Sequence, residues 1–253
     1  MDMINKQLIT RRFSRAVESY NREATAQKQI AYRMNDMLAH YLPARPRHVL
    51  EIGSGTGFLT RPLLHTFHPE KMILNDICHE MSTCFADLLS GRQVTFIPGD
   101  AERLSFPSGQ DLIVSCSAIQ WFVSPEQFFE RCNALLSSRG YFAFSTFGKE
   151  NLREITALTG SGLHYYSLEE LKNSLSIHYN IVSAGEEHIR LTFDTPLSVL
   201  YHLKHTGVTA VRQQAWTKGD LQEFCDKYTR LFSCGNAVTL TYHPIYIIAQ
   251  KKP

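Results

Sequence analysis

Five short apolar runs, separated by helical stretches of about a dozen residues, follow one another after residue 47. In order they read HVLEI, KMILND, VTFIPGD, DLIVSCSA and GYFAFSTF. Strands buried on both faces of a parallel sheet have this continuous apolar character, and parallel neighbours need a long crossover connection. The alternation therefore predicts an α/β, Rossmann-like fold, in which helices cover both faces of a mostly parallel sheet.

Helical signals flank this alternation on both sides. Before it, apolar residues recur at helical spacing in two stretches, one that includes Tyr20 and one that ends at Tyr41. The prolines of PARP then end the second predicted helix. After it, SLEEL begins with a capping box, and TPLSVLYHLKHTG has an N-cap threonine and a proline at the first helical position. The closing AVTLTYHPIYIIAQKK predicts one long antiparallel strand near an edge of the sheet.

These patterns predict a single domain over residues 1–253. Within it we expect an amino-terminal helical lid at 1–45, a cofactor-binding core at 46–150, and substrate-side helices with the final strands at 151–253. We also expect a helical insertion before the last strands.

Charge and composition exclude several classes of protein. The 26 Lys and Arg residues nearly balance 24 Asp and Glu, so the net charge of +2 gives no general attraction to nucleic acid. No apolar run approaches the roughly 18 residues of a membrane helix, and the amino terminus lacks the apolar core of a signal peptide. Six cysteines show no CxxC pairing. We expect a cytoplasmic protein with reduced thiols, no metal, and neither nucleic acid nor membrane as a partner.

The loop VLEIGSGTGFLT follows the first predicted strand and carries Gly53, Gly55 and Gly57. Glycines here permit positive φ and close approach of the backbone to a ligand at a helix start. A dinucleotide loop would read G-x-G-x-x-G, whereas the third glycine here comes one residue early. Glu51 also precedes the loop, and a carboxylate favours a ligand with an ammonium group over one with a pyrophosphate.

Two further acids end the next strands. Asp76 lies 21 positions after Gly55, where an acid can accept both hydroxyls of a ribose. Asp100 ends the third strand, and its carboxylate can accept from an adenine amino group while the amide of Ala101 faces the ring. The competing interpretation is that strand-end acids merely cap helices.

The set E-x-G-x-G-x-G, then Asp, then GDA resembles the class I S-adenosylmethionine-dependent methyltransferases over residues 49–147. The resemblance implies a seven-stranded sheet and S-adenosyl-L-methionine as cofactor. Phe13 and Tyr20, on the amino-terminal helix, would form a lid over the cofactor. The alternative is an amphipathic helix that only packs against the core. The implied cofactor-binding residues are Tyr20, Glu51, Gly53, Gly55, Gly57, Asp76, Ile77, Asp100, Ala101 and Ser117.

Longer motifs are similar to those of the family of carboxyl O-methyltransferases that act on malonyl-acyl carrier protein and open the pimeloyl branch of biotin synthesis. They are RRFSRAVESYNREATAQ, SCSAIQWF, STFGKENLREI, LHYYSLEEL and LYHLKHTGV. The resemblance implies a malonyl thioester on acyl carrier protein as the partner, with malonyl-coenzyme A as an alternative.

The chemistry of that reaction sets what the acceptor site needs. A malonyl carboxylate is ionised at neutral pH, so it needs no general base, but a buried anion needs donors around it. Arg153 follows the fifth strand and has a guanidinium that matches a carboxylate, against the alternative of a solvated arginine. Gln120, Trp121 and Tyr165 are the other candidates for the acceptor site, as pocket walls or hydroxyl donors.

An acidic carrier protein requires a basic docking surface. Two clusters qualify, each with a solvated face as the alternative: Arg11, Arg12 and Arg15 in one, and Lys204, His205, Arg212 and Lys218 in the other.

Other functions stay open from the sequence. A methyltransferase acting on another small carboxylate or on a quinone-type carbon has the same cofactor motifs. A nicotinamide-dependent oxidoreductase would use the same glycine loop, and a methyltransferase-like protein can bind the cofactor without catalysis.

Overall fold

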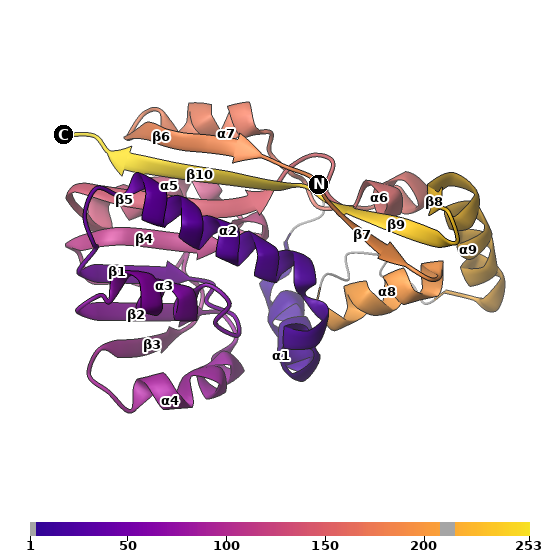
Figure 1. Ribbon diagram of the computed structural model, residues 1–253, viewed down its shortest axis with the longest axis horizontal. Helices are drawn as coiled ribbons and strands as arrows, with labels where there is room; N and C mark the ends of the chain where they lie inside the picture. The colour runs from indigo at the N-terminus through magenta and orange to yellow at the C-terminus, as the bar shows by residue number, and fades with distance from the viewer. Residues whose placement is uncertain (1–3, 208–215) are drawn as a thin grey trace.

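A seven-stranded sheet forms the centre of the fold in the computed structural model, which describes residues 4–207 and 216–253 (Figure 1). Its strand order is β3-β2-β1-β4-β5-β10-β6. The pairs from β3 to β5 are parallel, whereas β10 runs antiparallel to both of its neighbours. The strands are β1 His48–Ile52, β2 Lys71–Asp76, β3 Val94–Pro98, β4 Gln110–Cys116, β5 Leu136–Phe147, β6 Tyr179–Glu186 and β10 Pro244–Lys251. The predicted mostly parallel sheet is confirmed.

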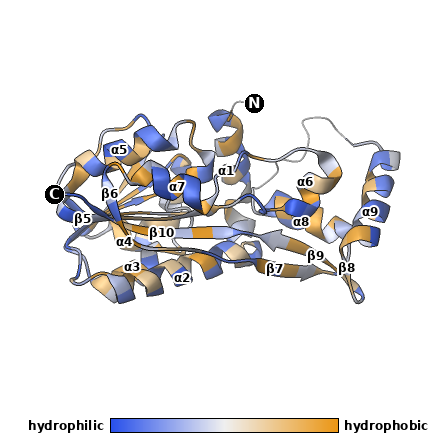
Figure 2. Ribbon diagram, turned by 90° about the horizontal axis from the view of Figure 1, so that it is seen from above, coloured by the Kyte–Doolittle hydropathy of each residue, from blue (hydrophilic) through white to orange (hydrophobic). Residues whose placement is uncertain are grey.

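Helices cover both faces of this sheet. The helices of the described residues are α1 Lys6–Glu23, α2 Thr25–Tyr41, α3 Thr60–Phe67, α4 Ala86–Leu89, α5 Pro125–Leu135, α6 Arg153–Thr159, α7 Leu168–Leu175, α8 Pro196–His205 and α9 Lys218–Phe232, with 3-10 turns η1 His79–Phe85 and η2 Ile119–Trp121; of these, α6, α8 and α9 lie beside a second sheet. Successive residues of a strand point to opposite faces, and accordingly Val49 packs in the core beneath α2 and α3 while Leu50 packs in the core beneath α5 and α7. Figure 2 shows the two helical layers on either side of the sheet.

The predicted amino-terminal helices are present, and two later helices begin where the sequence predicts. Both amphipathic patterns form helices, and Ile30, Met34 and Leu38 of α2 are fully buried. Ser167 begins α7 with a capping box, and the Thr195 side chain caps α8 by accepting from the backbone N–H of Ser198 at 3.2 Å. No helix within the described ranges is long and apolar enough to cross a membrane.

The final segment runs antiparallel and lies next to the edge strand β6, as predicted, but the prediction that it is one long strand is wrong. The segment divides at His243 into β9 Ala237–Tyr242 and β10, and β10 lies inside the main sheet between β5 and β6. Six consecutive residues of β10, from Pro244, are buried, which is a central-strand pattern. The division has a cause in hydrogen bonding: the N–H of His243 donates to Asn151 Oδ1, and its carbonyl accepts from Gly148 N–H.

A second, three-stranded sheet was not predicted. Its order is β7-β9-β8, with β7 Ile189–Phe193 and β8 Ser233–Cys234, and α6, α8 and α9 pack beside it. The expected helical insertion is thus a small α/β extension beyond the carboxyl ends of the main strands (Figure 1). Helix α9, which was not predicted, begins with a capping box of Thr217 and Asp220, a signal that is visible in the sequence.

Candidate active site

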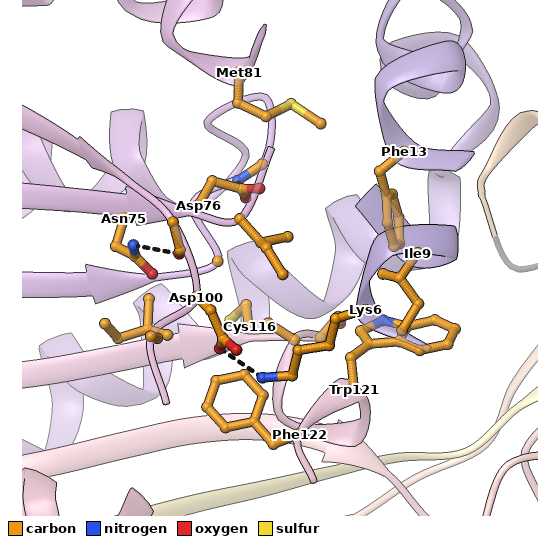
Figure 3. Close-up of a pocket in the computed structure, with 18 of the residues that line it drawn as sticks. Lys6, Ile9, Phe13, Asn75, Asp76, Met81, Asp100, Cys116, Trp121 and Phe122 are labelled. Atoms are coloured by element: carbon orange, nitrogen blue, oxygen red, sulfur yellow. Dashed lines mark hydrogen bonds and ion pairs between the residues drawn. The ribbon is translucent and has the colours of Figure 1, made fainter. Parts of the chain in front are cut away.

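A pocket opens where β1, β2, β3 and β4 end, beneath helix α1 (Figure 3). We call it the strand-end pocket. Ligands of open α/β sheets bind at this edge, outside the carboxyl ends of the strands. Eight of the ten predicted cofactor-binding residues line it: Tyr20, Gly53, Gly55, Asp76, Ile77, Asp100, Ala101 and Ser117. Glu51 lines an adjoining recess, and Gly57 lines neither.

The glycine loop has left-handed backbone at all three glycines, with φ of 69° at Gly53, 53° at Gly55 and 94° at Gly57. A Cβ at Gly53 would overlap that of Ala118, so the loop and the segment after β4 lie in direct contact. A Cβ at Gly57 would lie 2.8 Å from the Phe85 ring, so this glycine serves packing against η1. The first glycine therefore shapes the pocket, and the third holds the loop against the core.

Asp76 ties the loop to the end of β2. Its carboxylate accepts from the backbone N–H of Gly55 at 2.8 Å and of Cys78 at 2.9 Å. Burial nevertheless raises the pKa of Asp76 to about 6. A carboxylate has about four lone-pair positions, so two remain to accept hydroxyls of a ligand.

Glu51 lies beneath the loop, with 2% of its surface exposed. The Thr60 hydroxyl donates to its carboxylate at 2.8 Å, but burial dominates and raises the pKa of Glu51 to about 8. An ionisable group with so strongly shifted a pKa at a pocket is typical of a binding site for the opposite charge.

Three buried side-chain oxygens near Glu51 have no hydrogen-bond partner among the described residues: Gln27 Oε1, Ser54 Oγ and Ser117 Oγ. All three residues line the recess that contains Glu51. Unpaired buried acceptors are costly, so the recess is built for a ligand that donates hydrogen bonds. Neutral acceptors around one carboxyl fit the ammonium end of S-adenosylmethionine. Gln27 was missed from the sequence, although a polar residue on the apolar face of α2 was a usable signal.

Asp100 has a partner that the sequence analysis did not expect. Lys6 of α1 places its Nζ 2.5 Å from the Asp100 carboxylate, also contacts the Glu102 carboxylate, and lies over the Phe122 ring (Figure 3). This ion pair thus holds α1 against the segment that follows β3. Asp100 still lines the pocket, but one of its oxygens is already engaged.

Aromatic side chains of α1 close the pocket from the other side. Tyr20 stacks on Phe58 with ring centroids 5.8 Å apart, and Phe13 meets the edge of Trp121 at 5.9 Å. Phe13 and Ile9 reach the pocket from α1 opposite Asp76 (Figure 3). The lid expected for residues 1–45 stays a prediction: α1 borders the pocket, whereas α2 packs on the main sheet.

Replacing Lys6 by methionine is expected to weaken binding of S-adenosylhomocysteine by about tenfold, because a partly buried ion pair that holds the lid is lost. Isothermal titration calorimetry at two salt concentrations measures this, and the salt dependence should shrink in the variant. Arg103→Met is the control, since Arg103 is exposed and lies 3.8 Å from the same carboxylate. Unchanged or tighter binding by Lys6→Met would mean that the lysine competes with the ligand for Asp100.

A second, inner pocket adjoins the first. Tyr20 and Ser117 line the strand-end pocket, the Glu51 recess and the inner pocket alike. Ser117 has a left-handed φ of 54°, a strained conformation for a non-glycine residue that is common at functional sites. The residues that line the inner pocket are Phe13, Tyr20, Gln27, Ser117, Gln120, Trp121, Phe147, Asn151, Leu163, Tyr165, Thr206 and Tyr242.

Three of the four predicted acceptor residues therefore meet at the inner pocket. Gln120 donates to the Ser117 carbonyl at 2.6 Å, Trp121 forms a wall, and Tyr165 accepts from Asn151 at 2.9 Å. Arg153 is not among the lining residues, and its guanidinium pairs with Glu150 at 2.8 Å with 45% of its side chain exposed. Its predicted role in holding an acceptor stays a prediction.

A larger apolar passage continues outward from the inner pocket. The two share Gln120, Phe147, Leu163 and Tyr165. The passage is also lined by Ile4, Ile119, Phe122, Val123, Pro125, Thr146, Gly162, His164, Tyr166 and Leu171. The three spaces are thus contiguous through shared lining residues: the strand-end pocket, the small inner pocket beside it and the larger apolar passage.

No group of three His, Cys, Asp or Glu side chains that could hold a metal ion occurs within residues 4–207 and 216–253.

Known proteins resemble this chain both in sequence and in fold. Residues 50–144 match a family model described as a methyltransferase domain. Over 259 residues the chain is 53% identical to malonyl-[acyl-carrier protein] O-methyltransferase from Bacteroides thetaiotaomicron, an alignment that covers 98% of this chain and 99% of that protein.

Solved structures with low identity share the fold. A Bacillus halodurans protein that has been assigned as a methyltransferase superposes with a TM-score of 0.64 at 15% identity, covering 87% of this chain and 99% of that one. The N-methyltransferase NodS from Bradyrhizobium japonicum, solved with S-adenosyl-L-homocysteine, superposes with a TM-score of 0.53 at 12% identity, covering 94% and 99%. The α/β sheet described above is therefore a methyltransferase fold.

Proposed function

The chain belongs to the malonyl-[acyl-carrier protein] O-methyltransferases, and we propose that it transfers a methyl group from S-adenosylmethionine to the free carboxylate of a malonyl thioester. The product, a malonyl methyl ester on acyl carrier protein, would prime pimeloyl synthesis for biotin. The observation that carries the proposal is the junction at Tyr20 and Ser117, where the strand-end pocket and the inner pocket meet.

S-adenosylmethionine, when bound, supplies a methyl group on a positively charged sulfur. Asp76 would hold its ribose, Asp100 and Ala101 its adenine, and Glu51 with Gln27 its amino-acid end. The lid residues Phe13 and Tyr20 exclude water from the junction, and exclusion of water strengthens electrostatic interactions inside the site.

The inner pocket suits an anion that must stay reactive. None of its described lining residues is charged, and its polar groups are hydroxyls and amides. Neutral donors orient a carboxylate without a full ion pair, so the oxygen keeps its nucleophilic character. Because a malonyl carboxylate is already ionised at neutral pH, these residues need only place it and exclude water, and no base is required.

The apolar passage supports a substrate delivered on a long arm. A free small acid would need only the inner pocket, whereas a thioester on a flexible linear chain needs a route from the surface to that pocket. This favours the carrier protein, or coenzyme A, over a free dicarboxylate.

A basic face lies on neighbouring helices. Arg11 and Arg15 of α1 and Lys204 of α8 are exposed, and the Ser19 hydroxyl donates to the His205 carbonyl at 3.2 Å, which joins the two helices (Figure 1). The two predicted clusters thus lie on helices that contact each other, and Arg212 lies outside the described residues. We propose that these basic residues attract the acidic carrier protein. The cytoplasmic location stays a prediction.

Mass spectrometry of malonyl-acyl carrier protein, incubated with the protein and S-adenosylmethionine, tests the function. We expect a gain of one methyl group that an esterase removes. Malonyl-coenzyme A and free malonate are run in parallel, and turnover should fall in that order. Methylation of free malonate at the same rate would contradict the proposed use of the apolar passage, and no methylation of any malonyl substrate would contradict the function.

A further inference from the structure

Asn151 lies in the turn between β5 and α6 with 2% of its surface exposed, and both ends of its amide are engaged. Its Oδ1 accepts from the backbone N–H of His243 at 3.2 Å. Its Nδ2 donates to the Tyr165 hydroxyl at 2.9 Å. A backbone N–H can only donate, so the carbonyl end of the amide must face His243. The orientation of the amide is therefore fixed, and its NH₂ end faces Tyr165.

This orientation determines which way the Tyr165 hydroxyl donates. Its oxygen accepts from Asn151, so its own proton must be directed elsewhere. No side chain or carbonyl of the described residues accepts that proton, and the tyrosine lies where the inner pocket meets the apolar passage. Burial raises the pKa of Tyr165 to about 12, which keeps the hydroxyl a neutral donor at physiological pH.

We propose that Asn151 is a positioning residue for the methyl acceptor: it directs the Tyr165 O–H into the inner pocket, where the hydroxyl donates a hydrogen bond to the malonyl carboxylate. The inference rests on the proposed function. A fixed donor costs no reorganisation when the substrate enters, which matters in a pocket whose described lining holds no cation. One carboxylate oxygen would accept this hydrogen bond while the other faces the methyl donor.

The Asn151→Asp variant tests this with almost no change in shape. A carboxylate at this position still accepts from His243 but cannot donate to Tyr165, so the hydroxyl turns toward it and away from the pocket. At pH 8 we expect the KM for malonyl-acyl carrier protein to rise at least about tenfold, as for loss of a hydrogen bond to a charged group. The Kd for S-adenosylhomocysteine should stay within about twofold of wild type.

The pH profile separates positioning from a structural role. Because position 151 is buried, the pKa of the introduced carboxyl should be raised, so that at pH 6 part of it is protonated and can donate again. The KM of the variant should then recover toward that of wild type at the same pH. Tyr165→Phe should raise KM to a similar extent at both pH values, because no hydroxyl remains to be directed. Asn133→Asp is the matched control, since the Asn133 amide donates to the His178 carbonyl outside the pockets.

Three results would overturn the inference. A wild-type KM for Asn151→Asp at pH 8, an equal loss at both pH values, or a wild-type KM for Tyr165→Phe each contradicts it while leaving the proposed function intact. Wild-type protein that fails to methylate malonyl-acyl carrier protein would overturn the proposed function, and the inference with it.

Discussion

Replacing Gly53 by alanine is expected to weaken binding of S-adenosylhomocysteine by at least about 100-fold and to remove methylation. The new Cβ would overlap the Cβ of Ala118, and the φ of 69° is itself unfavourable for alanine. Overpacking and left-handed backbone each cost on the order of 1–3 kcal/mol. Because both costs fall on the loop that forms the pocket floor, the loop should move and its contacts with the ligand should be lost.

Isothermal titration calorimetry and thermal unfolding together measure this effect. Gly109→Ala is the control for backbone strain alone, since Gly109 has a φ of 80° and nothing within 4 Å of an added Cβ. It should lower the melting temperature by a few degrees and leave affinity unchanged. The double variant Gly53→Ala with Ala118→Gly removes the overlap and should recover much of the affinity. If it does not, contact with Ala118 is not the cause of the loss.

The cofactor half of the site was predictable because its signals are local. Glu51, the three glycines and Asp76 each occupy a fixed place relative to a strand end, and parallel strands bring their carboxyl ends to one edge of the sheet. The pattern of strands in the sequence therefore predicts both the fold and the position of these residues at the edge of the sheet. The prediction needed no knowledge of which side chains touch.

What the sequence did not reveal depends on contacts between distant segments. Lys6 meets Asp100 across 94 positions, and Asn151 meets His243 across 92. Neither pairing has a period or a spacing that marks it. The prediction of one continuous final strand failed for the same reason. An apolar run indicates burial, but only its partner strands decide whether it continues in one sheet or divides between two.

Arg153 shows a further limit of sequence reasoning. Its place after β5 was predicted correctly, but the direction of a long side chain depends on its neighbours, and here Glu150 engages it. Asn151, two residues earlier, lines the inner pocket and donates to Tyr165, which is why the proposal above rests on it.

Binding of S-adenosylhomocysteine is expected to strengthen by about tenfold per pH unit between pH 6 and 8, and to level off above about 8. The cause is Glu51, whose pKa burial raises to about 8 in the protein without ligand. At pH 7 this carboxyl is mostly protonated, whereas a ligand ammonium beside it favours the carboxylate. Binding should therefore release close to one proton at pH 7.

The stability of the folded protein should depend on pH in the opposite direction to ligand affinity. The pKa of Glu51 is raised from 4.5, so its ionisation opposes the folded state, and the ligand-free protein should lose stability as pH rises from about 4.5 to about 8. The pKa of Asp76 is raised from 3.8 to about 6, so its ionisation also lowers stability as pH rises, at the acid end of the same range. Saturating ligand should reduce the loss, because it stabilises the charged form of each group.

Calorimetry in two buffers with different ionisation enthalpies measures the released proton directly. Glu51→Gln keeps the size of the side chain and its contact with Thr60 but cannot ionise, so both the proton release and the pH dependence of affinity between pH 6 and 8 should disappear. Glu130→Gln, at an exposed position of α5, should leave both unchanged. Affinity that is flat with pH in the wild type, or proton uptake in place of release, would show that Glu51 does not face the ammonium group and that the recess below the glycine loop serves another part of the ligand.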